Sequence, residues 1–157
     1  MAINKTKRIY VYNLYDGHCA YCGEPIDIKD MHIDHIIPKN NFLSHVKNKY
    51  KVPEFLAHLT ELDCNHVDNL MPACRVCNNW KNAFDLELFR SEVSEQIKRL
   101  NDYSSNYRFA KRFGLVVENI KPIVFYFEKC DNSNRFLKNK KELYEIINDN
   151  ELPKSGL

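Results

Sequence analysis

Two short cysteine pairs constrain the fold of this chain more than any other feature of its sequence. "CAYC" contains Cys19 and Cys22, and "CRVC" contains Cys74 and Cys77. A Cys-x-x-Cys turn points both sulfurs toward one position, and two such turns make a tetrahedral thiolate cage suited to structural Zn²⁺. A redox-active pair or four buried thiols are the alternatives. Each pair is followed by Gly or Asn, which suits a tight turn, so we expect zinc.

Composition limits the classes of protein that this chain can belong to. With 157 residues, 44% of them hydrophobic and 28% charged, it is expected to form one globular domain with an appendage. A net charge of +2 is too small to indicate a nucleic-acid binder by itself. The chain has no apolar run typical of a signal peptide or a membrane span, so we expect a cytoplasmic protein without membrane contact. In that reducing compartment, metal ligands or free thiols are expected in place of disulfides.

The pattern of the chain changes near residue 84, and we expect a core over residues 1–84 and an extension over residues 85–157. In the core, a short helix is predicted over residues 6–15 and a strand over residues 31–37. A second strand leads into the second cysteine pair and a helix. Between the strands lies a polar insertion at about residues 40–68, in which "VPEFLAHLTEL" has a helical pattern.

The extension is predicted to mix helices and strands. Apolar residues at steps of three and four predict an amphipathic helix over residues 86–100. A shorter helix is expected over residues 106–113, with Gly114 as its C-terminal stop. "LVVENIKPIVFYFEK" predicts two strands joined by a turn, the second over residues 123–127, and a last helix is expected over residues 139–148.

The stretch "MHIDHIIPKN" places Asp34 and His35 side by side in a strand that otherwise has the composition of a buried one. Burying either group without a partner costs free energy, so a use for both is expected nearby. Neighbouring side chains of a regular strand point to opposite faces, so both reach one position only near a bulge or a strand end. The alternative is a pair at a strand end that takes part in no chemistry.

Three motifs, "IDHIIP" between the cysteine pairs, "DNLMPAC" leading into the second pair and "CNNWK" starting at its last cysteine, together resemble the HNH endonuclease family. The resemblance covers about residues 6–84 and implies an α+β fold with a zinc-stapled, treble-clef-like ββα-metal core. It implies that His35 activates water, that Asp34 and Asn78 bind the catalytic metal ion, and that Asn69 ties a loop down and orients the histidine. Many relatives have His at the position of Asn78, so the chain resembles an H-N-N variant.

The implied reaction is hydrolysis of DNA that leaves 5′-phosphate and 3′-hydroxyl ends. Such cleavage needs a deprotonated water and a cation that stabilises charge on the phosphate and the leaving oxygen. The usual pKa range of histidine suits the base that takes the proton from this water. A single hard cation with few protein ligands and several waters suits Mg²⁺, with Mn²⁺ as an alternative.

Four further residues are candidates for contact with nucleic acid. Lys81 and Asn82 lie one helical turn beyond Asn78, where Lys81 would hold a phosphate as a point charge. Arg75 and Lys39 are candidates for contacts with the backbone. For each of the four, simple exposure to solvent is the alternative, whereas Trp80 is expected to anchor the core behind the helix.

Two other functions stay open at this point. One is a zinc-stapled module that binds nucleic acid without cutting it. The other is the same chemistry on RNA, because contacts with the backbone serve either polymer. One active centre cuts one strand, so a double-strand break requires a homodimer or a partner protein, for which residues 85–157 are the candidate surface.

The remaining cysteines and histidines have no clear role. The motif "DCNH" suggests, as an alternative, a second metal site containing Cys64 and His66. We instead expect Cys64 to be a spare thiol, and we expect the same of Cys130. His58 has no partner at a recognisable spacing, and a surface or packing role is expected for it.

Overall fold

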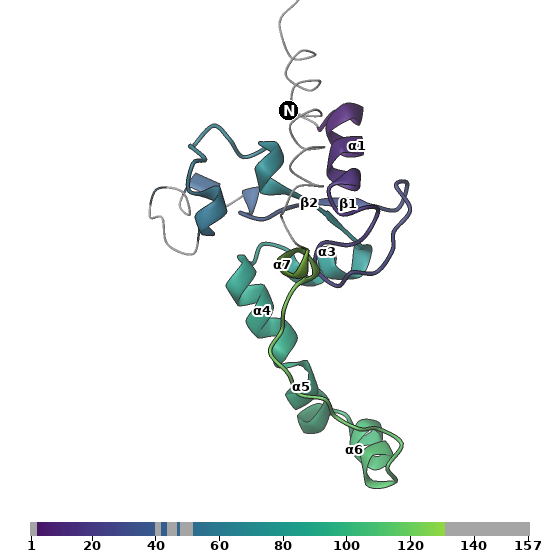
Figure 1. Ribbon diagram of the computed structural model, residues 1–157. Helices are drawn as coiled ribbons and strands as arrows, with labels where there is room; N and C mark the ends of the chain where they lie inside the picture. The colour runs from purple at the N-terminus through teal and green to yellow at the C-terminus, as the bar shows by residue number, and fades with distance from the viewer. Residues whose placement is uncertain (1–2, 40–41, 44–46, 48–51, 131–157) are drawn as a thin grey trace, which may run out of the picture.

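A two-stranded antiparallel sheet lies at the centre of the fold (Figure 1). Strand β1 is His32–His35 and strand β2 is Leu70–Ala73, with Asp34 opposite Met71. The computed structural model describes residues 3–39, 42–43, 47 and 52–130, so the helix expected over residues 139–148 lies outside the described residues.

Helix α1 (Lys5–Asn13) covers the β2 side of this sheet and corresponds to the helix predicted over residues 6–15. The helix begins where the Asn4 side chain accepts a hydrogen bond from the amide of Lys7, a standard N-cap. Its buried residues Tyr10 and Val11 share a hydrophobic cluster with Met31 and Val67, which precede the two strands, and with Leu70 of β2.

Helix α3 (Arg75–Lys81) follows β2 directly and completes a ββα unit. The sulfur of Cys74 accepts a hydrogen bond from the amide of Cys77, so the second cysteine pair also caps the helix. The helix ends at Asn82, whose φ of 45° lies in the left-handed region that asparagine tolerates. The α+β core with the expected ββα unit is therefore present in the structure.

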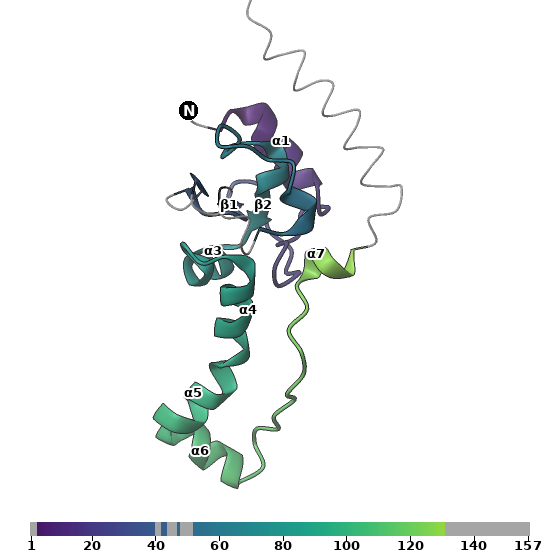
Figure 2. The ribbon, with the colours of Figure 1, turned by 90° about the vertical axis from the view of Figure 1, so that its left-hand side faces the viewer.

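Beyond the core, helices α4 (Leu86–Ser94), α5 (Gln96–Tyr103) and α6 (Ser105–Arg112) form an arm that extends away from the sheet (Figures 1 and 2). The single helix predicted over residues 86–100 is divided at Glu95, which keeps right-handed helical angles, so the interruption is minor. Gly114 follows α6 with a φ of 69°, in agreement with its expected role as a stop.

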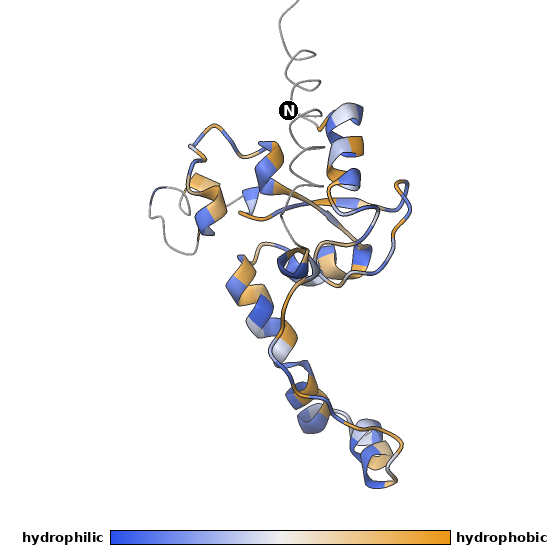
Figure 3. Cartoon of the chain, in the orientation of Figure 1, coloured by the Kyte–Doolittle hydropathy of each residue, from blue (hydrophilic) through white to orange (hydrophobic). Residues whose placement is uncertain are grey.

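The two strands predicted in residues 115–127 are wrong. Residues 115–125 form no strand, and the chain then forms the short helix α7 (Tyr126–Lys129). Figure 3 marks the stretch directly after α6 as hydrophobic, and Leu115, Val117 and Ile120 are largely exposed. High β-propensity favours an extended backbone, but a strand also needs a neighbouring sheet edge, and the described part of the chain offers none here.

The end of this return segment docks on the first cysteine pair instead. The amides of Tyr126 and Phe127 donate hydrogen bonds to the carbonyls of Tyr21 and Ala20 at 3.0 and 2.8 Å. The rings of Phe89 and Phe125 each lie 5.4 Å from the ring of Tyr21, edge to face. One hydrophobic cluster therefore joins the core to the extension across the boundary expected near residue 84.

The stretch over residues 52–62 of the insertion has less helix than its sequence pattern predicts. The described part of the insertion contains two 3₁₀ turns, η2 (Glu54–Leu56) and η3 (Val67–Asn69). Pro53 stands just before η2, and Leu56 and Leu59 anchor the segment in the core. Across the described ranges, no helix combines the length and the apolar character that a membrane crossing requires.

Candidate active site

The four cysteines of the two pairs meet at one point. The sulfurs of Cys19, Cys22, Cys74 and Cys77 all lie within 4.8 Å of one another, with Cys22 and Cys74 3.9 Å apart. Gly23 has a φ of 80° and lies against the Tyr126 ring, where an added Cβ would come within 2.8 Å of a ring carbon. The four cysteine sulfurs together fit a tetrahedral zinc ion.

Because these thiols lie so close together, their pKa values differ widely. The hydrogen bond with Cys77 lowers the pKa of Cys19 to about 4, and the same contact raises the pKa of Cys77. Burial raises the pKa of Cys22 to about 11. Several thiolates at such distances repel one another, so a bound cation is the natural way to compensate their charge.

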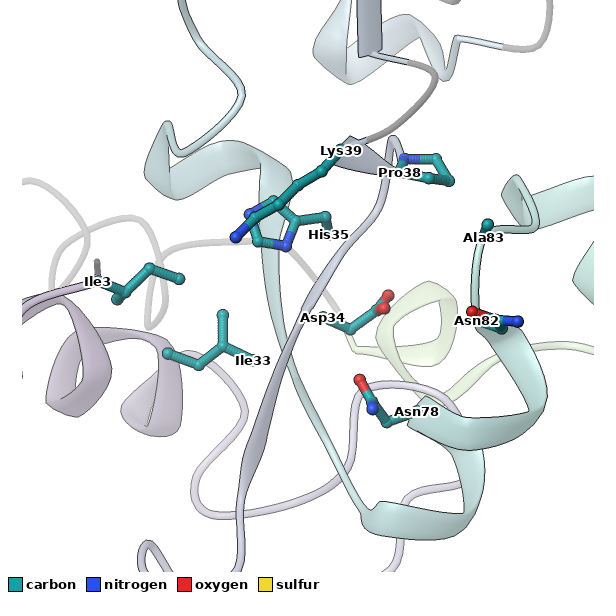
Figure 4. A pocket seen from close by; sticks show the side chains of 9 residues that line it. All are labelled: Ile3, Ile33, Asp34, His35, Pro38, Lys39, Asn78, Asn82 and Ala83. Atoms are coloured by element: carbon teal, nitrogen blue, oxygen red, sulfur yellow. The ribbon is translucent and has the colours of Figure 1, made fainter. Parts of the chain in front are cut away.

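A cavity of about 290 Å³ lies beside the sheet, and five of the predicted site residues line it (Figure 4). Asp34 and His35 reach it from β1, Lys39 from the loop after β1, and Asn78 and Asn82 from α3 and its end. In Figure 4 the Asp34 carboxylate points toward Asn78 and Asn82, whereas the His35 ring lies on the other side of the strand. Strand β1 ends at His35, and both side chains line the cavity at this strand end.

The carboxylate of Asp34 is buried and held by two donors. Lys81 Nζ lies 2.9 Å from Asp34 Oδ2, and the hydroxyl of Tyr21 donates a hydrogen bond to the same oxygen. The Lys81 ammonium also donates to the His35 carbonyl at 2.7 Å. Lys81 is completely buried, so its ammonium serves Asp34 inside the protein, in place of the phosphate contact expected from the sequence.

His35 forms a hydrogen bond with Asn65, a residue of the insertion. Its Nε2 lies 2.9 Å from the side-chain oxygen Oδ1 of Asn65, so Nε2 carries the hydrogen and Nδ1 keeps the lone pair. Burial lowers the pKa of His35 below its usual 6.5, and the charge of Lys39 acts in the same direction. The imidazole is therefore neutral at neutral pH, as a proton acceptor must be.

Asn69 joins the loop after β1 to the insertion. Its side chain is completely buried, and its Oδ1 accepts a hydrogen bond from the amide of Ile37 at 2.8 Å. Its Nδ2 donates to the carbonyls of Ile37 and Cys64 at 3.2 and 2.9 Å. These contacts keep the backbone just beyond His35 in place.

The other candidates for nucleic-acid contact lie at the surface. Lys39 and Asn82 are exposed and line the cavity, whereas Arg75 is exposed at the start of α3 and does not line it. Trp80 is 52% exposed, so its expected role as a core anchor is wrong. The side of α3 that faces the sheet carries the buried Lys81, which places Trp80 on the outer side.

Two site residues escaped the sequence analysis. Tyr21 lies between the cysteines of "CAYC", where a spacer residue normally has no role in a site. Asn65 lies in "DCNH", whose cysteine and histidine drew attention instead. Their contacts with Asp34 and His35 join residues 13 and 30 positions apart, and no local pattern indicates such contacts.

A ββα unit stapled by four thiols, with a carboxylate, an imidazole and an amide in one cavity, defines the ββα-metal class of proteins. Residues 19–50 match the HNH endonuclease family. This match over part of the chain, together with the cysteine cluster that it contributes to, supports a relationship to the HNH endonuclease family. No curated protein and no solved structure matches the chain.

The matched segment contains Asp34 and His35, whereas Asn69, Asn78 and the second cysteine pair lie beyond it. Members of this family are nucleases that use divalent metal ions. The match therefore indicates nuclease activity on nucleic acid.

Proposed function

We propose that this protein is a metal-dependent HNH endonuclease that hydrolyses phosphodiester bonds in DNA and leaves 5′-phosphate and 3′-hydroxyl ends. The observation that supports this proposal is the cavity that Asp34, His35 and Asn78 line together. Asp34 and Asn78 are the proposed metal ligands, His35 is the proposed general base, and Asn69 fixes the loop that follows it.

The oxygen donors of the cavity suit a hard cation, Mg²⁺ with Mn²⁺ as an alternative. Among the described residues, both contacts of the Asp34 carboxylate are made to Oδ2, which leaves Oδ1 to a metal ion, and Asn78 lines the same cavity. When bound, the ion would stabilise charge on the phosphate and on the leaving oxygen. The Lys81 ammonium offsets part of the Asp34 charge, so we expect weak binding until a substrate phosphate adds ligands.

In the proposed mechanism, the neutral His35 imidazole takes a proton from the attacking water through Nδ1. The Asn65 side chain fixes the ring by accepting the hydrogen of Nε2, and Asn69 holds the backbone behind it. Both residues act on the position of the base and touch no substrate atom. This arrangement directs one lone pair at one water, which is what general-base catalysis requires.

Contacts with the phosphate backbone would come from the exposed groups around the cavity. Lys39 and Asn82 stand at its edge, and Arg75 lies further along α3. Because phosphate contacts release counterions, binding should weaken steeply as salt rises. One cavity serves one strand, and residues 85–157 are the proposed surface for a second copy or a partner protein.

A nicking assay on supercoiled plasmid tests the proposal. The wild type is expected to cut with Mg²⁺ and to stop with chelator, and His35→Ala should keep its fold and lose cutting. His32→Ala is the matched control, since His32 is an exposed histidine of the same strand that does not line the cavity. Equal cutting by the wild type and His35→Ala would contradict the assignment of the base.

The same protein incubated with DNA and RNA separates the other functions. Cleavage of RNA alone would keep the chemistry and change the substrate. Binding without any cut product, unaffected by Mg²⁺, would instead indicate a module that only binds nucleic acid.

A further inference from the structure

A second group of metal-ligating side chains lies in the insertion, outside the cavity and outside the thiol cluster. One ligand atom from each of His58, His66 and Asp68 lies within 4.8 Å of the others. The three residues come from the turn after η2 and from the start of η3. Two imidazoles and one carboxylate are a common ligand set for transition metals.

The measured distances fit a metal ion between the three groups. His58 Nε2 lies 3.0 Å from Asp68 Oδ2, and His66 Nδ1 lies 3.7 Å from the same oxygen. Two donors that each bind zinc at about 2.1 Å with a tetrahedral angle lie about 3.4 Å apart. The two distances bracket this value, so small rotations of the side chains would complete the site.

We infer that His58, His66 and Asp68 bind a second transition-metal ion, with zinc as the ion that best suits imidazole and carboxylate ligands. Three protein ligands leave a fourth position for water. The His58 side chain is 52% exposed, so this position is open to solvent. Thiolate ligands are absent from this set, which distinguishes the site from the cysteine cluster.

Two existing contacts would have to give way, and the first is the hydrogen bond between His58 Nε2 and Asp68 Oδ2 at 3.0 Å, whose proton the ion would replace. In the second, the amide of Asp68 donates a hydrogen bond to His66 Nδ1 at 3.3 Å, which caps η3. This bond is longer than the usual 2.9–3.0 Å and is therefore weak. A coordinate bond to zinc is much stronger, so the ion would displace it.

The ion would close a loop that carries two residues of the candidate active site. Asn65, which bonds His35, directly precedes His66, and Asn69 directly follows Asp68. A metal ion that ties His58 to η3 would fix the backbone between them and with it the acceptor of the His35 hydrogen. This consequence for the base depends on the proposed function, whereas metal binding does not.

Counting zinc ions per chain tests the site. The full chain is saturated with zinc, freed of excess metal by desalting, and analysed by inductively coupled plasma mass spectrometry. The wild type should hold one zinc ion more per chain than His58→Gln and Asp68→Asn. His32→Gln is the matched control and should hold as many as the wild type. Equal counts in all four proteins would overturn the inference.

Two further measurements keep the result clear. Circular dichroism establishes that each variant is folded, which we expect for His58→Gln because this side chain is half exposed. Amide hydrogen exchange over residues 58–68 should slow when zinc is added to the wild type and stay unchanged in His58→Gln. Unchanged exchange in the wild type would contradict the inference that the metal ion fixes the backbone of this loop. Neither measurement uses cleavage, so failure of the proposed function would leave both results standing.

Discussion

The ammonium of Lys81 lies 2.9 Å from Asp34 Oδ2, and both side chains are buried beneath the cavity. A buried carboxylate next to a site for a cation would be costly alone, because nothing compensates its charge before the metal ion binds. Lys81 provides this compensation from α3, the helix that also carries Asn78. The position of the proposed metal ligand thus depends on a residue that approaches no substrate.

Replacing Lys81 by Met should destabilise the fold, because it leaves Asp34 as an uncompensated buried charge. We expect the free energy of unfolding in urea to fall by about 3 kcal/mol, as for other broken buried ion pairs. Lys98→Met is the control, since Lys98 forms an exposed ion pair with Glu95 and its loss should change little. A Lys81→Met variant as stable as this control would contradict the role of the ammonium.

Cleavage by the wild type should decline in acid with a midpoint below pH 6.5. Burial lowers the pKa of His35, so the imidazole stays neutral and able to accept a proton down to a lower pH than an exposed histidine. As the pH falls through this lowered pKa, the ring is protonated and activity is lost. The pH profile of kcat/KM measures this limb, and a midpoint above 6.5 would contradict the assignment.

Replacing Asn65 by Ala should slow cleavage and move the acid limb. The hydrogen bond that His35 donates to Asn65 raises the pKa of His35. Loss of this bond should therefore shift the midpoint of the acid limb to lower pH. Loss of the ring's orientation should reduce kcat by about 10-fold, a typical cost for removing a positioning residue. Asn106→Ala, an exposed residue of α6, is the control. A reduced rate with an unmoved limb would indicate a general structural effect.

Replacing Cys74 by Ser should remove zinc and the fold together. Structural zinc contributes about 10 kcal/mol or more in small domains, which is comparable to the whole stability of a domain of this size. The far-ultraviolet circular dichroism and the zinc content should both fall. Cys130→Ser should keep both, because Cys130 lies outside the thiol cluster. A folded, zinc-free Cys74→Ser protein would contradict the structural role.

Local sequence patterns predicted the parts of the site that local chemistry defines. The cysteine spacing predicted the thiol cluster, and the family resemblance of the motifs between and after the pairs led to Asp34, His35, Asn69 and Asn78. These residue types suit the roles proposed for them, so their identity and order along the chain are informative.

Contacts between distant segments were beyond such patterns. Nothing near Lys81 indicates that its ammonium reaches a carboxylate 47 positions earlier in the chain. Likewise, the apolar residues of "PIVFYF" have the pattern of a strand, yet Phe125 and Phe127 pack on Tyr21. Propensity describes what a segment favours alone, and tertiary packing decides between the alternatives.

The docking of residues 125–127 on the first cysteine pair matters for anyone who expresses this protein in pieces. A truncation after residue 84 would strip the aromatic cover from Tyr21, whose hydroxyl holds the proposed metal ligand. The smallest useful fragment therefore runs to the end of α7 at Lys129. It includes the arm, because the chain leaves the core through the arm helices and returns to it at α7.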